Sequence, residues 1–207
     1  MKKIFKKLIL LFFLILTISC CKKYPYPPIF QLSENTPFGF IQTKVINSDS
    51  TVGQLVTSKL IEYITYEQKG SFVEIGSLDN ILSRYNSKEL TPDIIKKIGN
   101  DYNVNTLVYN EIEFSDIQPD FHINFANPSF HAKVKLTACL RLKIYETKDG
   151  TLIFIKTSKR KTELSNVYLN KDHIFFDSKT FDESQYNLID KLTWQITKDF
   201  RTTYKCK

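Results

Sequence analysis

The stretch "FHAKVKLTACLRLKI", residues 130–144, carries the clearest structural signal in the sequence. Apolar residues stand at every even position from 132 to 144, and mostly basic or polar residues stand between them. Successive side chains of a β-strand point to opposite faces of a sheet. The alternation therefore predicts a long strand with one buried face and one face in contact with water.

The residues that follow this strand predict a hairpin and a final helix. Asp149-Gly150 indicates a tight turn, because this pair tolerates the backbone conformation that hairpins require. Residues 151–161 are then expected to form the returning strand. Residues 182–200 repeat apolar side chains at helical spacing, with Trp194 at the flank. The expected apolar face of this helix consists of Tyr186, Ile189, Leu192, Ile196 and Phe200.

The N-terminal half alternates strand-like and helix-like segments. Thr51 and Gln54 have the spacing of a helix capping box, Ser77 is expected to cap a short helix, and Thr91-Pro92 is a typical helix start. The whole chain is therefore expected to be an α/β fold, a mixed β-sheet with helices packed on it: a βαβααβ core, a long β-hairpin and a C-terminal helix. The remaining expected strands cover residues 38–46, 71–76 and 105–114.

The N-terminus reads as a secretory signal. Four lysines precede an apolar run at residues 8–18, which is shorter than the roughly 20 residues that a membrane-spanning helix needs. A basic start followed by such a run is typical of a signal peptide. An uncleaved signal anchor and an ordinary signal peptide with two incidental cysteines are the alternatives.

"LTISC", residues 16–20, resembles the lipobox of bacterial lipoproteins, in which a small residue such as Ser19 precedes the lipidated cysteine. The resemblance implies cleavage after Ser19 and lipidation of Cys20. Cys21 is not the aspartate associated with inner-membrane retention, so we expect the outer membrane, facing the periplasm, with another bacterial membrane or the cell surface as the alternative. The expected organisation is a signal peptide (1–19), a lipidated cysteine with a proline-rich tether (20–37) and a single periplasmic α/β domain (38–207).

Composition excludes several classes of function. Removal of residues 1–19 takes away four lysines and no acidic residue, which lowers the formal net charge from +7 to about +3. This is too weak an imbalance to predict nucleic-acid binding. The sequence has six glycines, no glycine-rich phosphate loop and no nucleophile-elbow motif. We therefore expect neither an enzyme nor a bound cofactor.

The histidines and cysteines leave two questions of pairing. His122 and His131 stand near two aspartates, Asp116 and Asp120, but the spacing is loose for a metal site, and we expect solvated loop residues rather than metal ligands. A disulfide between Cys139 and Cys206 is permitted in an oxidising compartment but is not established by the sequence.

Two groups of residues are candidates for binding a partner. Lys133, Lys135, Arg141 and Lys143 form a basic stripe on one face of the expected long strand, which residues 159–161 extend across the hairpin. Phe121 and Phe125 stand in the segment 117–129, which we expect to be a connecting loop, where they either form an apolar interface patch or fold back onto the core. Charge alternation on a strand is more often a solvated sheet face, and that alternative stays open.

Two longer motifs resemble those of one family of envelope lipoproteins. "IIKKIGNDYNVNTLVYNEI", residues 94–112, is similar to a family motif in which a helix leads into an apolar strand. "LRLKIYETKDGTLIFIKTSK", residues 140–159, is similar to a second motif that ends in Thr-Ser-Lys. Asn110 stands where the family usually has glycine. The family is that of the curli-secretion-channel lipoproteins and their soluble relatives, which include activators of penicillin-binding proteins and uncharacterised outer-membrane lipoproteins.

This resemblance implies either a membrane-tethered interaction module or an oligomeric secretion-channel subunit. A channel subunit would contribute two β-hairpins whose arms cross the membrane, and each arm needs about 9 to 11 residues. The two places for such hairpins, residues 117–129 and 164–177, are short, and the first contains two prolines. We therefore expect a non-enzymatic module that binds another envelope protein, with homo-oligomerisation and the channel subunit as alternatives.

Overall fold

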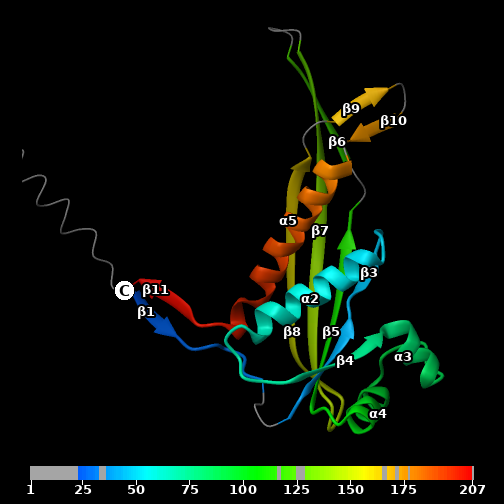
Figure 1. The fold of residues 1–207 in the computed structure, drawn as a ribbon, viewed down its shortest axis with the longest axis vertical. Helices are drawn as coiled ribbons and strands as arrows, with labels where there is room; N and C mark the ends of the chain where they lie inside the picture. Colours follow the sequence, from blue (N-terminus) through cyan, green and yellow to red (C-terminus); the bar gives the residue numbers. More distant parts are fainter. Residues whose placement is uncertain are drawn as a thin grey trace, which may run out of the picture.

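The computed structural model describes residues 23–32, 36–115, 118–124, 129–164, 167–170, 173–176 and 178–206, with the backbone alone for residues 118–124, 129–134, 167–170, 173–176, 178–180 and 206. The chain folds into a mixed β-sheet with helices on both faces (Figure 1), which confirms the expected α/β fold class. The strands of this sheet are β2 (Phe38–Gln42), β3 (Lys44–Ile46), β4 (Phe72–Ser77), β5 (Thr106–Phe114), β6 (Gln118–Asn124), β7 (Ser129–Glu146) and β8 (Thr151–Leu164).

The long strand β7 is the centre of the sheet. The strand order is β4–β2–β5–β7–β6, with β3 also beside β5 and β8 beside β7. Strands β2, β3, β4 and β5 pair in parallel, whereas β7 is antiparallel to β5, β6 and β8. The alternation that predicted β7 is confirmed in its described part, where Leu136, Ala138, Leu140, Leu142 and Ile144 are all buried.

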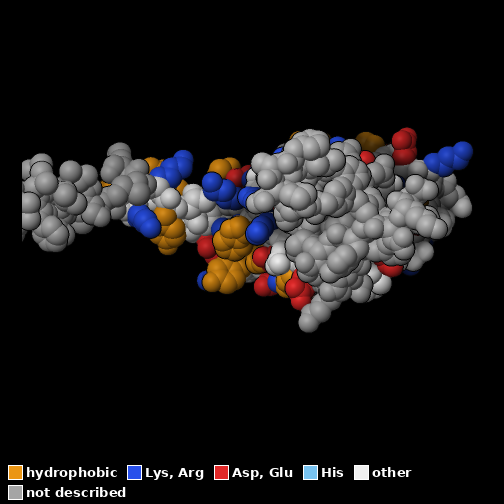
Figure 2. Space-filling view, turned by 90° about the horizontal axis from the view of Figure 1, so that it is seen from above, with side chains coloured by type: hydrophobic (Ala, Val, Ile, Leu, Met, Phe, Trp, Pro, Cys, Tyr) orange, Lys and Arg blue, Asp and Glu red, His pale blue; other side chains and the backbone are white. Residues whose placement is uncertain are grey.

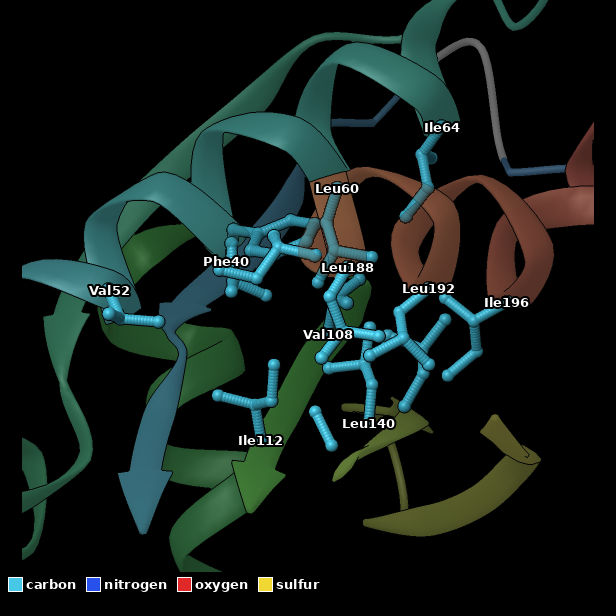
Figure 3. Close-up of a cluster of buried hydrophobic side chains, with 14 of the residues drawn as sticks. Phe40, Val52, Leu60, Ile64, Val108, Ile112, Leu140, Leu188, Leu192 and Ile196 are labelled. Atoms are coloured by element: carbon cyan, nitrogen blue, oxygen red, sulfur yellow. The ribbon is translucent and has the colours of Figure 1, made fainter. Parts of the chain in front are cut away.

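The main hydrophobic core lies between this buried face of the sheet and two helices, α2 (Thr51–Thr65) and α5 (Ser178–Ile196). Figure 3 shows Leu60 of α2 and Leu188 of α5 beside Val108 of β5, with Leu140 of β7 close by. Fully burying one such aliphatic side chain contributes about 1.5–3 kcal/mol. The two helices are therefore held on the sheet by hydrophobic burial.

A second, smaller core covers one end of the opposite sheet face. Helices α3 (Leu78–Arg84) and α4 (Pro92–Tyr102) place isoleucines against Ile41, Leu107 and Tyr109. Ile41 follows Phe40 of the main core, and Leu107 precedes Val108 of the main core. Neighbouring strand residues point to opposite faces of the sheet, so the two cores lie on opposite faces. The rest of this face, which we call the outer face, extends along β5, β7 and β8 beyond these two helices.

The helix starts agree with the sequence in two of three cases. Ser77 and Thr91 accept hydrogen bonds from the backbone of Asn80 (3.4 Å) and Ile94 (3.4 Å), as predicted. The capping box expected at Thr51 is wrong, because Thr51 is already inside the helix and the side chain of Asp49 accepts the hydrogen bond from its backbone N–H.

The C-terminal helix also differs in detail. It begins at Ser178 rather than at Asp182, and its last turn is a 3₁₀-helix, η1 (Thr197–Phe200). Tyr186 is largely exposed, whereas Leu188 is buried in its place. Within the described residues, no helix is both long and apolar enough to cross a membrane.

The segment 117–129 is not the loop that we expected. Residues 118–124 form β6, which pairs in register with residues 129–135 of β7 and extends the sheet into a projecting hairpin (Figure 1). Proline is tolerated in β6 because, among the described strands, this one pairs only with β7. A second hairpin, β9 (Val167–Asn170) with β10 (His173–Phe176), follows β8.

The two ends of the described chain pair with each other. Strand β1 (Lys23–Tyr26), which lies in the expected tether, forms an antiparallel ribbon with β11 (Thr203–Cys206). The ribbon projects from the side of the domain (Figure 1). The chain then returns to the core, where Gln68 binds the backbone of Phe30 (2.7 Å), Leu32 (2.8 Å) and Phe200 (3.0 Å). The N-terminal segment is therefore attached to the domain before β2 begins.

Candidate functional site

The structure separates the predicted site residues into three groups. Cys20 and Phe125 lie outside the described residues. For Phe121 in β6 and Lys133 in β7 the backbone is described and the side chains are not. The other three, Lys135, Arg141 and Lys143, lie on the outer face of β7, where the alternation predicted them.

The central part of the basic stripe is paired rather than free. Arg141 Nη1 forms an ion pair with Glu111 Oε1, and Glu111 is its register partner on β5. Lys143 Nζ lies 5.7 Å from the ring centroid of Tyr109. Burial, together with the charge and the hydrogen bond of Glu111, raises the pKa of Tyr109 above its ordinary value. These contacts are those of a solvated sheet face, in agreement with the simpler of the two readings of the stripe.

Strand β8 contributes two further cations to this face. Lys159 and Lys161 are exposed and pair in register with Cys139 and Thr137 of β7. Arg160 does not join the stripe as expected, because it points to the helix side, where its Nε donates to Gln195 Oε1 (2.7 Å). The period of two along a strand makes this separation unavoidable.

An apolar group on β8 was missed by the sequence reasoning. Leu152, Ile153 and Ile155 are 43%, 44% and 55% exposed. Among the described strands β8 pairs only with β7, so its other edge presents unpaired backbone groups. The run "TLIFI", residues 151–155, contained the signal: four consecutive apolar residues on a strand cannot all face the core. We call the residues Leu152, Ile153, Ile155, Lys159 and Lys161 the β8 surface.

The cysteines and histidines can be placed in part. Cys139 is a free thiol on the outer face, so the Cys139–Cys206 disulfide that the sequence permitted is not formed in this structure. His122 and His131 are register partners across β6 and β7, although their side chains are outside what is described. Where side chains are described, no group of three or more His, Cys, Asp or Glu residues could hold a metal ion.

No protein-family model matches the sequence, and no curated protein matches it significantly. Solved structures do share the fold. One is a protein from Helicobacter pylori described as a neuraminyllactose-binding hemagglutinin homolog, at 14% identity, with 85% of this chain and 91% of that chain covered and a TM-score of 0.51. Another is the PelC dodecamer from Paraburkholderia phytofirmans, at 5% identity, with 88% and 98% covered and a TM-score of 0.50.

A looser likeness exists to the C-terminal domain of LpoB from Salmonella enterica, at 10% identity, with 62% of this chain and 84% of that chain covered and a TM-score of 0.39. This similarity is too weak to carry an argument. The fold that the family resemblance implied is shared with PelC. At such low identities, the likeness concerns the fold and not the function.

Proposed function

We propose that this chain is a non-enzymatic lipoprotein, anchored through Cys20 to a bacterial envelope membrane, that binds another envelope protein through the β8 surface. The envelope location is supported by the signal-like residues 1–19 and by the lipobox-like stretch at residues 16–20. The outer membrane, with the domain facing the periplasm, is the location that the sequence around Cys20 favours.

The observation that carries this proposal is the exposure of Leu152, Ile153 and Ile155 on an edge strand. Large apolar side chains that gather on a surface and are bordered by polar residues are typical of protein–protein contacts. Lys159 and Lys161 continue the same strand and would favour an acidic region of the partner. The ion-paired part of the basic stripe contributes less, since exposed pairs of this kind add little to binding.

Site-specific photo-crosslinking in cells tests the β8 surface. A photo-reactive amino acid at Ile155 should capture a defined partner. The same amino acid at Tyr66 should not, because Tyr66 is 73% exposed but follows α2, which packs on the buried face of the sheet and not on the outer face. Identical products from both positions, or no reproducible product from Ile155, would contradict the proposed contact.

The anchor is tested separately. The intact mass of protein extracted from membranes should correspond to a chain that begins at an acylated Cys20. An unlipidated N-terminus at any other residue would contradict the anchor without affecting the β8 experiment.

A homo-oligomer, in the extreme case a secretion-channel subunit, is the second candidate. The observation in its favour is that PelC, which shares the fold at a TM-score of 0.50, is a dodecamer. Against membrane-crossing arms, β6 pairs over seven residues and β9 over four, below the 9 to 11 residues that a crossing strand needs. Size measurement in detergent separates the candidates: a monomer supports the tethered module, and a large, heat-resistant oligomer supports the channel.

A further inference from the structure

A pocket opens beside the ribbon of the two chain ends. Its volume is about 440 Å³, and it lies where the end of α5, the 3₁₀-turn η1 and β11 meet. Ten described residues line it, of which four are cationic and one, Glu67, is acidic. Glu67 already accepts a hydrogen bond from the backbone N–H of Thr202 (2.6 Å). The pocket therefore has an excess of positive charge and suits an anion. Its cations are Arg160, Lys198, Arg201 and Lys205.

Arg201 supplies a donor that the protein itself does not use. The residue is only 5% exposed, and its guanidinium carbon lies 3.2 Å from the ring centroid of Trp194 and 5.8 Å from that of Tyr63. Arg201 Nη2 donates to the carbonyl oxygen of Trp194. Nη1 is buried, and within the described part of the chain no atom accepts a hydrogen bond from it.

Such an arrangement is costly when no anion is bound. A buried, unsatisfied donor on a charged group carries a desolvation penalty. Burial lowers the pKa of Arg201 from its ordinary value, but a guanidinium remains protonated in proteins. An oxygen of an anionic group that reached Nη1 would relieve this penalty.

The ribbon that borders the pocket has the composition of a membrane–water interface. Tyr24, Tyr26 and Tyr204 are exposed, and Lys205 Nζ lies 4.9 Å from the ring centroid of Tyr26. Figure 2 shows lysine and arginine side chains next to hydrophobic ones along this projecting part of the chain. Tyrosine, tryptophan and lysine are the residues that collect at the headgroup level of a bilayer.

The position of the ribbon in the chain indicates which anion lies near the pocket. Only Cys21 and Lys22 separate the proposed lipidated Cys20 from β1, and three residues of extended chain span at most about 11 Å. An acylated Cys20 would therefore hold β1 and its partner β11 within the headgroup layer. Phospholipid phosphates would then be the most concentrated anions near the pocket.

We propose that the β1–β11 ribbon and the Arg201 pocket form a binding surface for anionic phospholipid headgroups, which seats the domain on its membrane in one orientation. This inference rests on the proposed anchor at Cys20. The lipid chains supply the attachment, and the ribbon and pocket supply the orientation, with the headgroup phosphate facing Lys198, Arg201 and Lys205. As a result, the outer face of the sheet, including the β8 surface, keeps one orientation relative to the membrane.

Trp194 makes the inference testable, since it is the only tryptophan in the chain. The full-length protein, extracted from membranes, is reconstituted into vesicles of phosphatidylcholine with or without phosphatidylglycerol. Quenching of Trp194 fluorescence by acrylamide is then measured. We expect Trp194 to be shielded in the anionic vesicles and accessible in the zwitterionic ones. High salt should abolish the difference, because it screens charges at this range.

Two matched variants identify the residues responsible. Lys198→Gln with Lys205→Gln removes two exposed cations of the pocket. Each lysine near an anionic surface favours contact with the headgroups by about fivefold. The double variant should therefore lower the ratio of protein in contact with the headgroups to protein without this contact by about 25-fold. Lys97→Gln with Lys148→Gln removes the same charge from α4 and the β7–β8 turn (Figure 1) and should leave the shielding unchanged.

The outcomes separate this inference from the anchor. Suppose that the intact-mass spectrum shows acylated Cys20. Equal quenching in both kinds of vesicle then overturns the headgroup surface, as does an equal loss of Trp194 shielding in the control variant. The anchor is unaffected by either result. Shielding produced by inorganic phosphate in zwitterionic vesicles also overturns it, because the pocket would then take a free anion. If the spectrum shows no acyl chain, flotation of that protein with anionic but not zwitterionic vesicles still supports the surface, and its absence refutes it.

Discussion

The variant Gly99→Ala distinguishes helix propensity from tertiary packing, because the two predict opposite changes in the free energy of unfolding. Gly99 is buried in the middle of α4. Replacing glycine by alanine inside a helix usually stabilises it by about 1 kcal/mol. In this structure, however, a Cβ at position 99 would lie 2.4 Å from Thr147 Cβ and 2.6 Å from its Oγ1. Such an approach is far inside van der Waals contact.

Thr147 cannot easily move away. Its Oγ1 donates to the carbonyl oxygen of Val104 (2.6 Å), and its backbone N–H donates to the carbonyl oxygen of Asn105 (3.0 Å). Overpacking a site of this kind costs about 1–3 kcal/mol. Taking the upper end for so short a contact and subtracting the gain in helix propensity leaves a destabilisation of about 2 kcal/mol. This corresponds to a melting temperature lower by about 4–8 °C for a chain of this size.

Urea denaturation followed by far-UV circular dichroism measures the free energy of unfolding. Asn100→Ala, at the exposed neighbouring position, is the control for helix propensity and should stabilise slightly. Adding Thr147→Ala to Gly99→Ala should not restore stability, because the closest atom, Thr147 Cβ, is retained. A Gly99→Ala protein as stable as the unmodified chain would refute the reasoning.

Three further variants probe other contacts. Asp49 accepts a hydrogen bond from the backbone of Thr51 (2.8 Å), which holds the pKa of Asp49 below its ordinary value. The carboxylate therefore contributes stability above its ordinary pKa, and this stability is lost as the pH falls through the lowered pKa of the folded protein. Asp49→Ala should remove that contribution, which thermal melts over an acidic pH series would show. Burial and the hydrogen bond to Asp190 raise the pKa of Tyr63 to about 12. The folded protein therefore loses stability as the pH rises above about 10, the ordinary pKa of tyrosine. Tyr63→Phe should reduce this loss, because phenylalanine does not titrate. Leu192→Ala truncates a fully buried side chain and should cost about 2–5 kcal/mol in urea denaturation; a loss below about 1 kcal/mol would contradict the packing described.

The parts of the fold that the sequence predicted correctly are those decided by neighbouring residues. The two periodicities place Leu140 of β7 and Leu192 of α5 in one core without any knowledge of the tertiary structure. The positive φ of Gly150 (+76°) was likewise signalled by Asp149-Gly150. Here the close approach of Pro92, whose carbonyl oxygen would lie 2.5 Å from a Cβ at position 150, adds a second reason for glycine.

The parts that could not be predicted depend on pairing between distant residues. Arg141 looked like a free cation because Glu111 precedes it by thirty residues, and only the register of β5 with β7 brings the two together. Segment 118–124 looked like a loop because Pro119 and polar residues interrupt any alternation. An edge strand tolerates both, but nothing local indicates which segment will be at the edge.

The pairing of β1 with β11 changes what the N-terminal segment can do. The prolines at 25, 27 and 28 predicted an extended tether. Residues 23–26 are extended as β1, but a free tether would let the domain take any orientation. Pairing with β11 and the contacts of Gln68 with Phe30 and Leu32 remove most of that freedom. The N-terminal end of the described chain is thereby connected to α5 and η1. With the proposed anchor at Cys20, the orientation of the β8 surface would be a property of the fold rather than of a linker. The headgroup experiment is for this reason also a test of whether the protein presents β8, the proposed partner-binding strand, in a defined direction.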